Sequence, residues 1–437
     1  MAESNKEVSG IITSDVDKYV AGLLQFIEKS PEAFHAVSSI KEMLAEAGYE
    51  EIKETEQWNI IPGGKYFVIR NSSSIAAFHI PADTIKGFHI VAAHSDSPTF
   101  KVKEKPEIKV EEQYVKLNTE KYGGMIMGTW LDRPLSVAGR LVVRQDGELI
   151  EVPVNVDKDL LVIPNVAIHM NRDMNKGVEY NAQTDMLPLY AAAENDMSFM
   201  DTVAEAAGVS TEDILAHDLF LYVREKGRKI GAGGEYILAP RLDDLQCAYA
   251  TVTALIESVP DNYINVSVIF DNEEVGSGTR QGADSTFLED VLMRITEALG
   301  RNTDWFRQKV SDSFLISADN AHAVHPNHPE KADPTNRPYL NGGVVIKYHG
   351  SQRYTTDAFT AAVMKELCRK ANVPVQTYTN RSDIAGGSTL GNISTAHVSL
   401  PSVDIGLPQL AMHSAVETAG SKDTAYAVYM MKAFFSE

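Results

Sequence analysis

The sequence predicts an α/β fold that is interrupted by a β-rich insertion, and two observations lead to this prediction. Over the first hundred residues, and again from Tyr236 onward, amphipathic segments alternate with short apolar runs, as in helices packed on a sheet. From about 101 to 235 the pattern changes to alternating apolar and polar residues, which is typical of half-exposed antiparallel strands. We therefore expect a discontinuous main domain, 1–100 and 236–437, and an inserted β-rich domain, 101–235.

The first part of the main domain contains two predicted helices and three predicted strands. Residues 14–29 begin with an N-cap Ser or Asp and space their apolar residues by three or four, so they predict a helix, and 34–48 predict a second one. Short apolar runs predict strands at 67–70, 74–80 and 88–93. The last run leads into His94-Ser95-Asp96-Ser97-Pro98, a strand end with metal-binding side chains.

The same polarity patterns predict the helices and strands of the insertion and of the second part of the main domain. In the insertion, 107–118 and 148–163 alternate in polarity and predict strands, whereas 200–217 predict a surface helix. After the insertion, we expect strands that end at Phe270, at Ala318 and in the run 403–410, and helices after Arg241 and at 286–299, 356–371 and 421–435.

Composition limits the function. The 437 residues are enough for two domains. The formal charge of −20 argues against a nucleic-acid partner and against an anionic membrane surface. Cys247 and Cys368 are too few for a disulfide framework. The stretch MAESNKEVSG has no signal-peptide pattern, and no segment has eighteen consecutive apolar residues, so we expect a cytoplasmic protein.

The most informative stretch is 266–278, where an apolar run ends in Asp271, Glu273 and Glu274 before two glycines. A strand that ends in acids places them at the edge of a sheet, where open α/β folds bind ligands. Neighbours on an extended chain point in opposite directions, so we expect Glu273 and Glu274 to have different roles. A solvated acidic turn is the alternative interpretation of this motif taken alone.

Five metal-binding side chains follow predicted strands or begin predicted helices: His94, Asp243, Glu274, Asp319 and His413. Any one of them alone is more often a helix-capping acid or a packed core histidine. Five at the same edge of one sheet are harder to explain in that way. Two imidazoles and three carboxylates suit zinc, cobalt or manganese.

The number of ligands suits two metal ions that share one carboxylate and each keep a position open for water. Such a pair lowers the pKa of a bridging water and polarises a carbonyl group. A nearby carboxylate that is not a ligand then serves as general base, and Glu273 is the candidate. We expect Asp96 to accept a hydrogen bond from the far nitrogen of the His94 ring, although a short acid in a turn can simply cap it.

These residues stand in motifs that resemble the aspartyl aminopeptidase family, metallopeptidase family eighteen, over essentially the whole chain. The motifs are His94-Ser95-Asp96-Ser97-Pro98, Arg241-Leu242-Asp243, Asp271-Asn272-Glu273-Glu274-Val275-Gly276-Ser277, Ser317-Ala318-Asp319-Asn320-Ala321-His322 and Gln409-Leu410-Ala411-Met412-His413-Ser414. The Gly-rich stretch 382–389 resembles the bacterial branch rather than the eukaryotic enzymes, which leaves a strict preference for N-terminal Asp or Glu open.

The resemblance implies a three-layer, mixed-sheet zinc-exopeptidase domain and a dizinc aminopeptidase that acts on short peptides. One metal would take His94, Asp243 and Asp319. The other would take Asp243, Glu274 and His413, with Glu273 as general base. The inserted domain would be a dimerisation domain, and six dimers would form a homododecamer.

The resemblance implies roles for three further residues. His169 lies in a segment that reaches a neighbour's active site in family members, so it is expected to bind the developing oxyanion; an ordinary loop histidine is the alternative. Lys347 matches a pocket lysine and, with Asp383, is expected to bind substrate; a surface lysine on a strand is the alternative.

Two other functions remain open at this point. A deacylase or carboxypeptidase would use the same metal centre, and Arg381 beside Asp383 would then clamp a substrate carboxylate. A catalytically silent scaffold protein is the alternative from another class, but it predicts lost metal ligands, and all five are in place.

Overall fold

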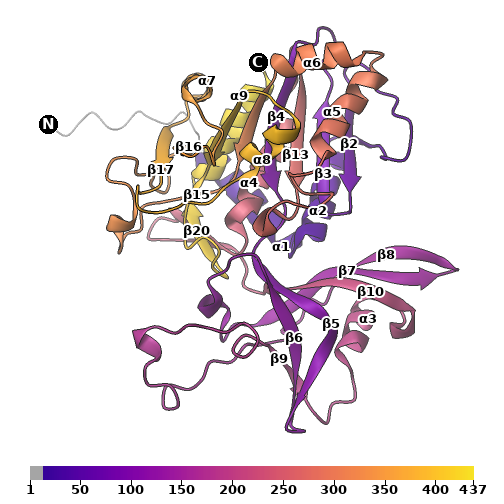
Figure 1. The fold of residues 1–437 in the computed structure, drawn as a ribbon, viewed down its shortest axis with the longest axis vertical. Helices are drawn as coiled ribbons and strands as arrows, with labels where there is room; N and C mark the ends of the chain where they lie inside the picture. The colour runs from indigo at the N-terminus through magenta and orange to yellow at the C-terminus, as the bar shows by residue number, and fades with distance from the viewer. Residues whose placement is uncertain (1–12) are drawn as a thin grey trace.

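The computed structural model describes residues 13–437, which form two bodies, an α/β domain and an inserted domain beside it (Figure 1). The prediction that the N-terminus has no signal peptide concerns residues outside this range. No helix in the described part of the chain is both long and apolar enough to cross a membrane.

A mixed nine-stranded sheet forms the centre of the α/β domain. Its strands, in spatial order, are β1 (Glu50–Glu51), β2 (Lys65–Arg70), β3 (Ser74–His79), β13 (Tyr263–Phe270), β4 (Gly87–His94), β14 (Phe314–Ala318), β18 (Ser402–Gly406), β16 (Val344–Tyr348) and β17 (Val375–Thr379). From β13 to β18 the four neighbouring strands are parallel. Their carboxyl ends therefore meet at one edge, where parallel sheets present ligand sites.

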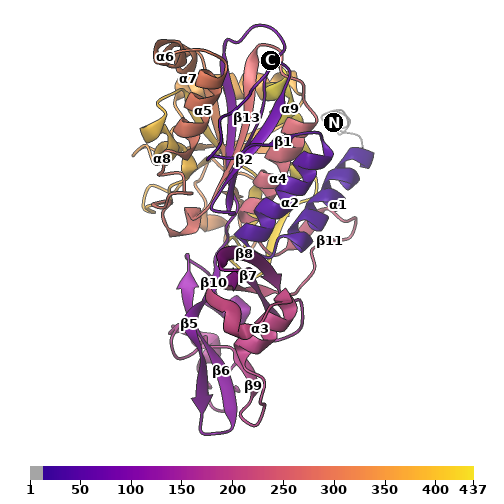
Figure 2. The same ribbon diagram turned by 90° about the vertical axis from the view of Figure 1, so that its right-hand side faces the viewer.

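Helices cover both faces of this sheet, which gives three layers (Figure 2). One face carries α1 (Thr13–Lys29), α2 (Ala33–Glu46), α4 (Leu242–Ile256), α7 (Ala358–Lys370) and α9 (Asp423–Phe435). The other carries α5 (Phe287–Ala298), α6 (Thr303–Ser311) and α8 (Leu390–His397). The mixed α/β class predicted from the sequence is confirmed.

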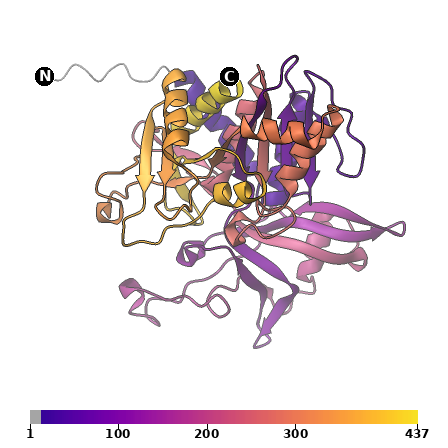
Figure 3. The ribbon, with the colours of Figure 1, turned by 45° about the horizontal axis from the view of Figure 1, so that its top comes forward.

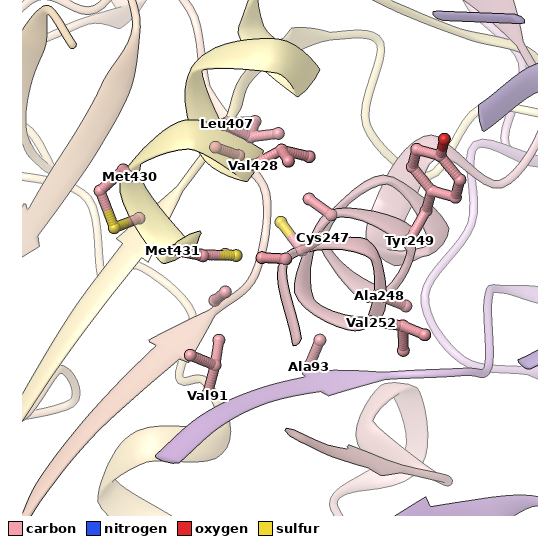
Figure 4. Packing of buried hydrophobic residues seen from close by; sticks show 14 of the residues in the cluster. Val91, Ala93, Cys247, Ala248, Tyr249, Val252, Leu407, Val428, Met430 and Met431 are labelled. Carbon is pink, nitrogen blue, oxygen red and sulfur yellow. The ribbon is translucent and has the colours of Figure 1, made fainter. Parts of the chain in front are cut away.

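Alternation along β4 produces the two cores. Val91 and Ala93 face α4 and α9, while Ile90 and Ala92 face the α5 side. Figure 4 shows Val91 and Ala93 below Cys247 and Met431, with the helices packed directly on the strand. Burial on both faces explains why this strand is a continuous apolar run.

The inserted domain is built on a six-stranded antiparallel sheet, which lies below the α/β domain in the view of Figure 3. Its order is β8 (Glu148–Asn155), β7 (Leu135–Gln145), β10 (Ile214–Val223), β5 (Thr99–Val110), β6 (Tyr114–Tyr122) and β9 (Leu189–Ala192), with α3 (Phe199–Ala207) beside it. A third sheet joins β11 (Arg228–Ile230), β12 (Tyr236–Ala239), β20 (Glu417–Gly420), β19 (Pro408–Leu410) and β15 (Ala321–His322).

One predicted element of the insertion is confirmed, and two are shorter than predicted. The segment 107–118 does form antiparallel strands, as predicted, with a turn from β5 into β6 at Glu111 and Glu112, which adopt positive φ. The strand predicted within 148–163 ends at Asn155. The helix predicted over 200–217 ends at Ala207, where Gly208 provides a left-handed cap, and the chain continues into β10.

Candidate metal centre

Three of the five predicted metal ligands, His94, Glu274 and Asp319, lie at the carboxyl edge of the central sheet. His94 is the last residue of β4, and Asp319 directly follows β14. Glu274 lies on the short 3-10 turn η4 (Glu273–Val275) that follows β13. Because β13, β4 and β14 are adjacent and parallel, these three side chains reach the same edge.

Asp243 and His413 approach this edge from outside the sheet. Asp243 lies in the first turn of α4, where the backbone departs from helical geometry and the peptide to Asp244 is cis. His413 lies between β19 and β20 with a φ of 64°. Glu417 joins the two, because its carboxylate accepts the N–H of Asp243 at 3.0 Å and that of His413 at 2.7 Å.

The ligand atoms form three overlapping groups, and within each group they lie within 4.8 Å of one another: His94, Asp243, Asp244 and Asp319; His94, Glu273 and Glu274; Asp243, Glu274 and His413. Asp243 connects the two histidines, since its Oδ1 lies 3.7 Å from His94 Nε2 and its Oδ2 lies 3.2 Å from His413 Nε2. Glu274 Oε1 lies 3.3 Å from the same nitrogen of His413.

Both imidazole rings are held by their other nitrogen. His94 Nδ1 lies 3.1 Å from the carbonyl oxygen of Asp96 and 3.3 Å from its carboxylate. His413 Nδ1 lies 2.5 Å from the carbonyl oxygen of Gly124. A donor role for each Nδ1 leaves each Nε2 free to bind a metal.

The residues fit a divalent cation. Asp243 Oδ1, Asp244 Oδ1 and Glu274 Oε1 are buried and have no hydrogen-bond partner among the described residues. A buried carboxylate without a partner is costly, and a cation at this position would stabilise all three. Carboxylate oxygen and imidazole nitrogen are ordinary zinc ligands.

The pKa values reflect the same excess of negative charge. Burial raises the pKa of Glu273 to about 8 and that of Glu274 to about 7, and neighbouring carboxylates add to both shifts. Burial alone would lower the pKa of His413, but Asp243 and Glu274 raise it to about 11. The centre therefore favours any bound positive charge.

The prediction that Glu273 and Glu274 alternate along an extended strand is wrong. Strand β13 ends at Phe270, Asn272 adopts a left-handed conformation, and the two glutamates lie on η4. The turn brings both carboxylates into one group with His94, whereas a strand would have directed them to opposite sides. Glu274 also contacts His413, so their surroundings still differ.

The remaining predicted residues lie in different surroundings. Lys347 is buried on β16, with Nζ 3.5 Å from Asp319 Oδ2, so it is not a surface lysine. Asp383 is exposed and forms a two-point ion pair with Arg381, at 2.9 and 2.7 Å. The side chain of His169 is exposed on the long segment between β8 and β9 and belongs to none of the groups of potential metal ligands found among residues 13–437.

Sequence reasoning missed two acids of the centre. Asp244 joins the group around His94, and one of its oxygens accepts the His94 backbone N–H at 3.1 Å. The sequence signal for Asp244 was its position directly after Asp243. Glu417 has no comparable signal, because its role depends on two backbone N–H groups that are distant in sequence.

Comparison with known proteins identifies the family. The family model described as Aminopeptidase I zinc metalloprotease (M18) matches residues 26–435. The chain belongs to this family. It is therefore a metal-dependent aminopeptidase, and the resemblance found in the motifs is confirmed.

Individual M18 relatives match over nearly the full length. The probable M18 family aminopeptidase 2 of Clostridium novyi is 48% identical over 429 residues, which cover 96% of this chain and 99% of the relative. Ape4, solved in a complex with Nbr1, has a TM-score of 0.93 at 36% identity and covers 98% of this chain and 87% of that one. The mApe1 dodecamer of S. cerevisiae has a TM-score of 0.84 at 28% identity, with 95% and 96% covered.

Proposed function

We propose that this M18 enzyme removes N-terminal residues from short peptides with two divalent cations, most suitably zinc, and with Glu273 as general base. The observation that supports the proposal is the shared position of Asp243 between His94 and His413. One cation would be held by His94, Asp243 and Asp319, the other by Asp243, Glu274 and His413. When bound, the cations would lower the pKa of a water molecule and polarise the scissile carbonyl.

The protein's own groups would handle the proton. Glu273 is a carboxylate outside both ligand sets, and it lies within 4.8 Å of ligand atoms of His94 and Glu274. We expect it to accept the proton of the attacking water and to pass it to the leaving amine. Asp96 would hold the His94 ring, as its contacts with Nδ1 indicate.

Substrate binding extends the proposal to three residues. Lys347 lies beside Asp319 at the centre and would pair with an acidic substrate group. Asp383 would bind from the loop after β17 (Val375–Thr379), once its pairing with Arg381 is broken. His169 would act in the site of a neighbouring subunit, which is consistent with its exposed position.

We include self-association in the proposal. The dodecameric mApe1 relative shares this fold over 95% of the chain, and the segment of His169 exposes Val166, Ile168 and Met170. Light scattering during gel filtration should give a mass near twelve times the 48.0 kDa of one chain. A stable monomer at micromolar concentration would exclude this assembly.

A cytoplasmic location is also part of the proposal. Both cysteines are free and buried, which supports a reducing, cytoplasmic location.

A deacylase or carboxypeptidase is less favoured because the chain belongs to the M18 aminopeptidase family. The deciding experiment combines metal analysis with paired substrates. Elemental analysis should find two zinc ions per chain, chelation should abolish hydrolysis of aminoacyl-nitroanilides, and zinc or cobalt should restore it. Peptides with a free N-terminus should be cleaved, whereas their N-acetylated counterparts should not. Full activity in the metal-free enzyme would refute the proposal.

A further inference from the structure

The end of β6 in the inserted domain contacts the metal centre. The Tyr122 hydroxyl donates to Asp96 Oδ2 at 2.7 Å and accepts from Asn272 Nδ2 at 2.8 Å. The ring is positioned by an edge-to-face contact with Phe220 of β10. Tyr122 thus connects the inserted domain to two loops of the α/β domain.

The hydrogen bond from Tyr122 matters because the Asp96 carboxylate contacts several groups of the metal centre. Besides facing His94 Nδ1, its carboxylate accepts the backbone N–H of Glu273 at 3.1 Å and that of Glu274 at 3.2 Å. One carboxylate therefore orients a histidine ring and also the turn that carries both glutamates. The Tyr122 hydroxyl fixes the orientation of this carboxylate.

The next two residues contact the other side of the centre. Gly123 has a φ of 78°, and a Cβ at this position would lie 3.1 Å from Glu274 Cβ and 3.3 Å from its carbonyl oxygen. The Gly124 carbonyl contacts His413 Nδ1, and the Ile126 N–H donates to the His413 carbonyl at 2.9 Å. Consecutive residues thus contact Asp96, Glu274 and His413.

We propose that Tyr122, Gly123 and Gly124 are positioning residues through which the inserted domain sets the geometry of the metal centre. The inference depends on the metal centre of the proposed function, and it adds residues from a different domain. Tyr122 holds the carboxylate that orients His94, Gly123 permits close packing against Glu274, and Gly124 fixes the tautomer of His413. Groups that orient metal ligands typically change metal affinity or activity by about 10–100-fold when they are removed.

The first test compares two tyrosines. Tyr122→Phe removes the hydroxyl and keeps the ring. Tyr222→Phe is the matched control, because Tyr222 lines the same interdomain cavity of about 470 Å³ but donates to Asn155 of the inserted domain at 2.8 Å. We expect Tyr122→Phe to weaken zinc binding and to lower kcat, each by about 10–100-fold, with KM nearly unchanged and a shifted spectrum of the cobalt-substituted protein. Tyr222→Phe should match the wild type in all four measurements.

The second test compares two glycines. Gly123→Ala places a methyl group against Glu274, whereas Gly147→Ala puts alanine at a similar φ of 85° with no atom within 4 Å. Both variants place alanine at a similar positive φ, which strains an L residue. Only Gly123→Ala should weaken zinc binding and change the cobalt spectrum.

Zinc affinity measured by competition with a chromophoric chelator separates the possible outcomes. Wild-type affinity in both Tyr122→Phe and Gly123→Ala would overturn the inference, and so would equal losses in the test and control variants. A wild-type protein that binds no zinc at this centre would instead overturn the proposed function itself.

Discussion

Strand β4 carries two buried histidines, five residues apart, in opposite surroundings. His89, at the amino end, stacks on Tyr263 with ring centroids 3.7 Å apart and on Phe434 at 4.2 Å. Its Nδ1 has no hydrogen-bond partner among residues 13–437. Burial lowers its pKa to about 3, so it remains neutral and serves as an aromatic packing group.

His94, at the carboxyl end, is equally buried but faces carboxylates. Burial opposes its protonation, yet Asp244, Asp243 and Asp96 together raise its pKa well above the usual value. The difference shows that burial alone does not decide the charge of a histidine. At the carboxyl edge of the sheet, the neighbouring acids favour a positive charge.

The largest expected effect concerns the base at the carboxyl edge. Glu273→Gln should lower kcat by about 10²–10⁴-fold, because the attacking water loses its proton acceptor. Zinc content should stay at the wild-type level, since Glu273 lies outside both proposed ligand sets. Glu297→Gln, on the exposed face of α5, is the control. Loss of zinc from Glu273→Gln would assign this residue to the ligands instead.

Substituting each of the two histidines separately tests the comparison directly. His94→Ala should weaken zinc binding by more than about 100-fold, beyond the usual effect of an outer group, because it removes a proposed ligand. His89→Phe keeps the aromatic stack and should leave zinc affinity unchanged. Chelator competition on both variants provides the measurement, and similar zinc affinities in the two would contradict the comparison.

The smallest expected effect is on stability at acidic pH. Between about pH 6.5 and 3 the unfolded chain binds a proton at His89 that the folded chain excludes, so stability falls as pH falls. At pH 5 this contribution is about 2 kcal/mol. His89→Phe should therefore lose less stability than the wild type between pH 7.5 and 5. Urea unfolding of both proteins at pH 7.5 and at pH 5 measures the stability that each one loses. Equal losses in the two proteins would argue against a neutral His89.

The sequence supported the α/β class and the M18 family because the proposed metal ligands stand in local motifs. It could not reveal the contacts of Tyr122, whose partner Asn272 is 150 residues away. The pair Gly123-Gly124 indicates only a turn when taken alone. The geometry at Glu273 was missed for another reason: a left-handed Asn272 ends the extended chain before Glu273 and Glu274, and asparagine only weakly signals this conformation.

The position of Tyr122 at the end of β6 also bears on attempts to make a smaller enzyme. Excising the insertion, which contains the whole six-stranded sheet from Thr99 to Val223, would take with it the groups that brace Asp96 and His413. We expect a truncated chain to keep every proposed metal ligand but to bind zinc more weakly. The proposal therefore predicts that neither domain can be redesigned without regard to the other.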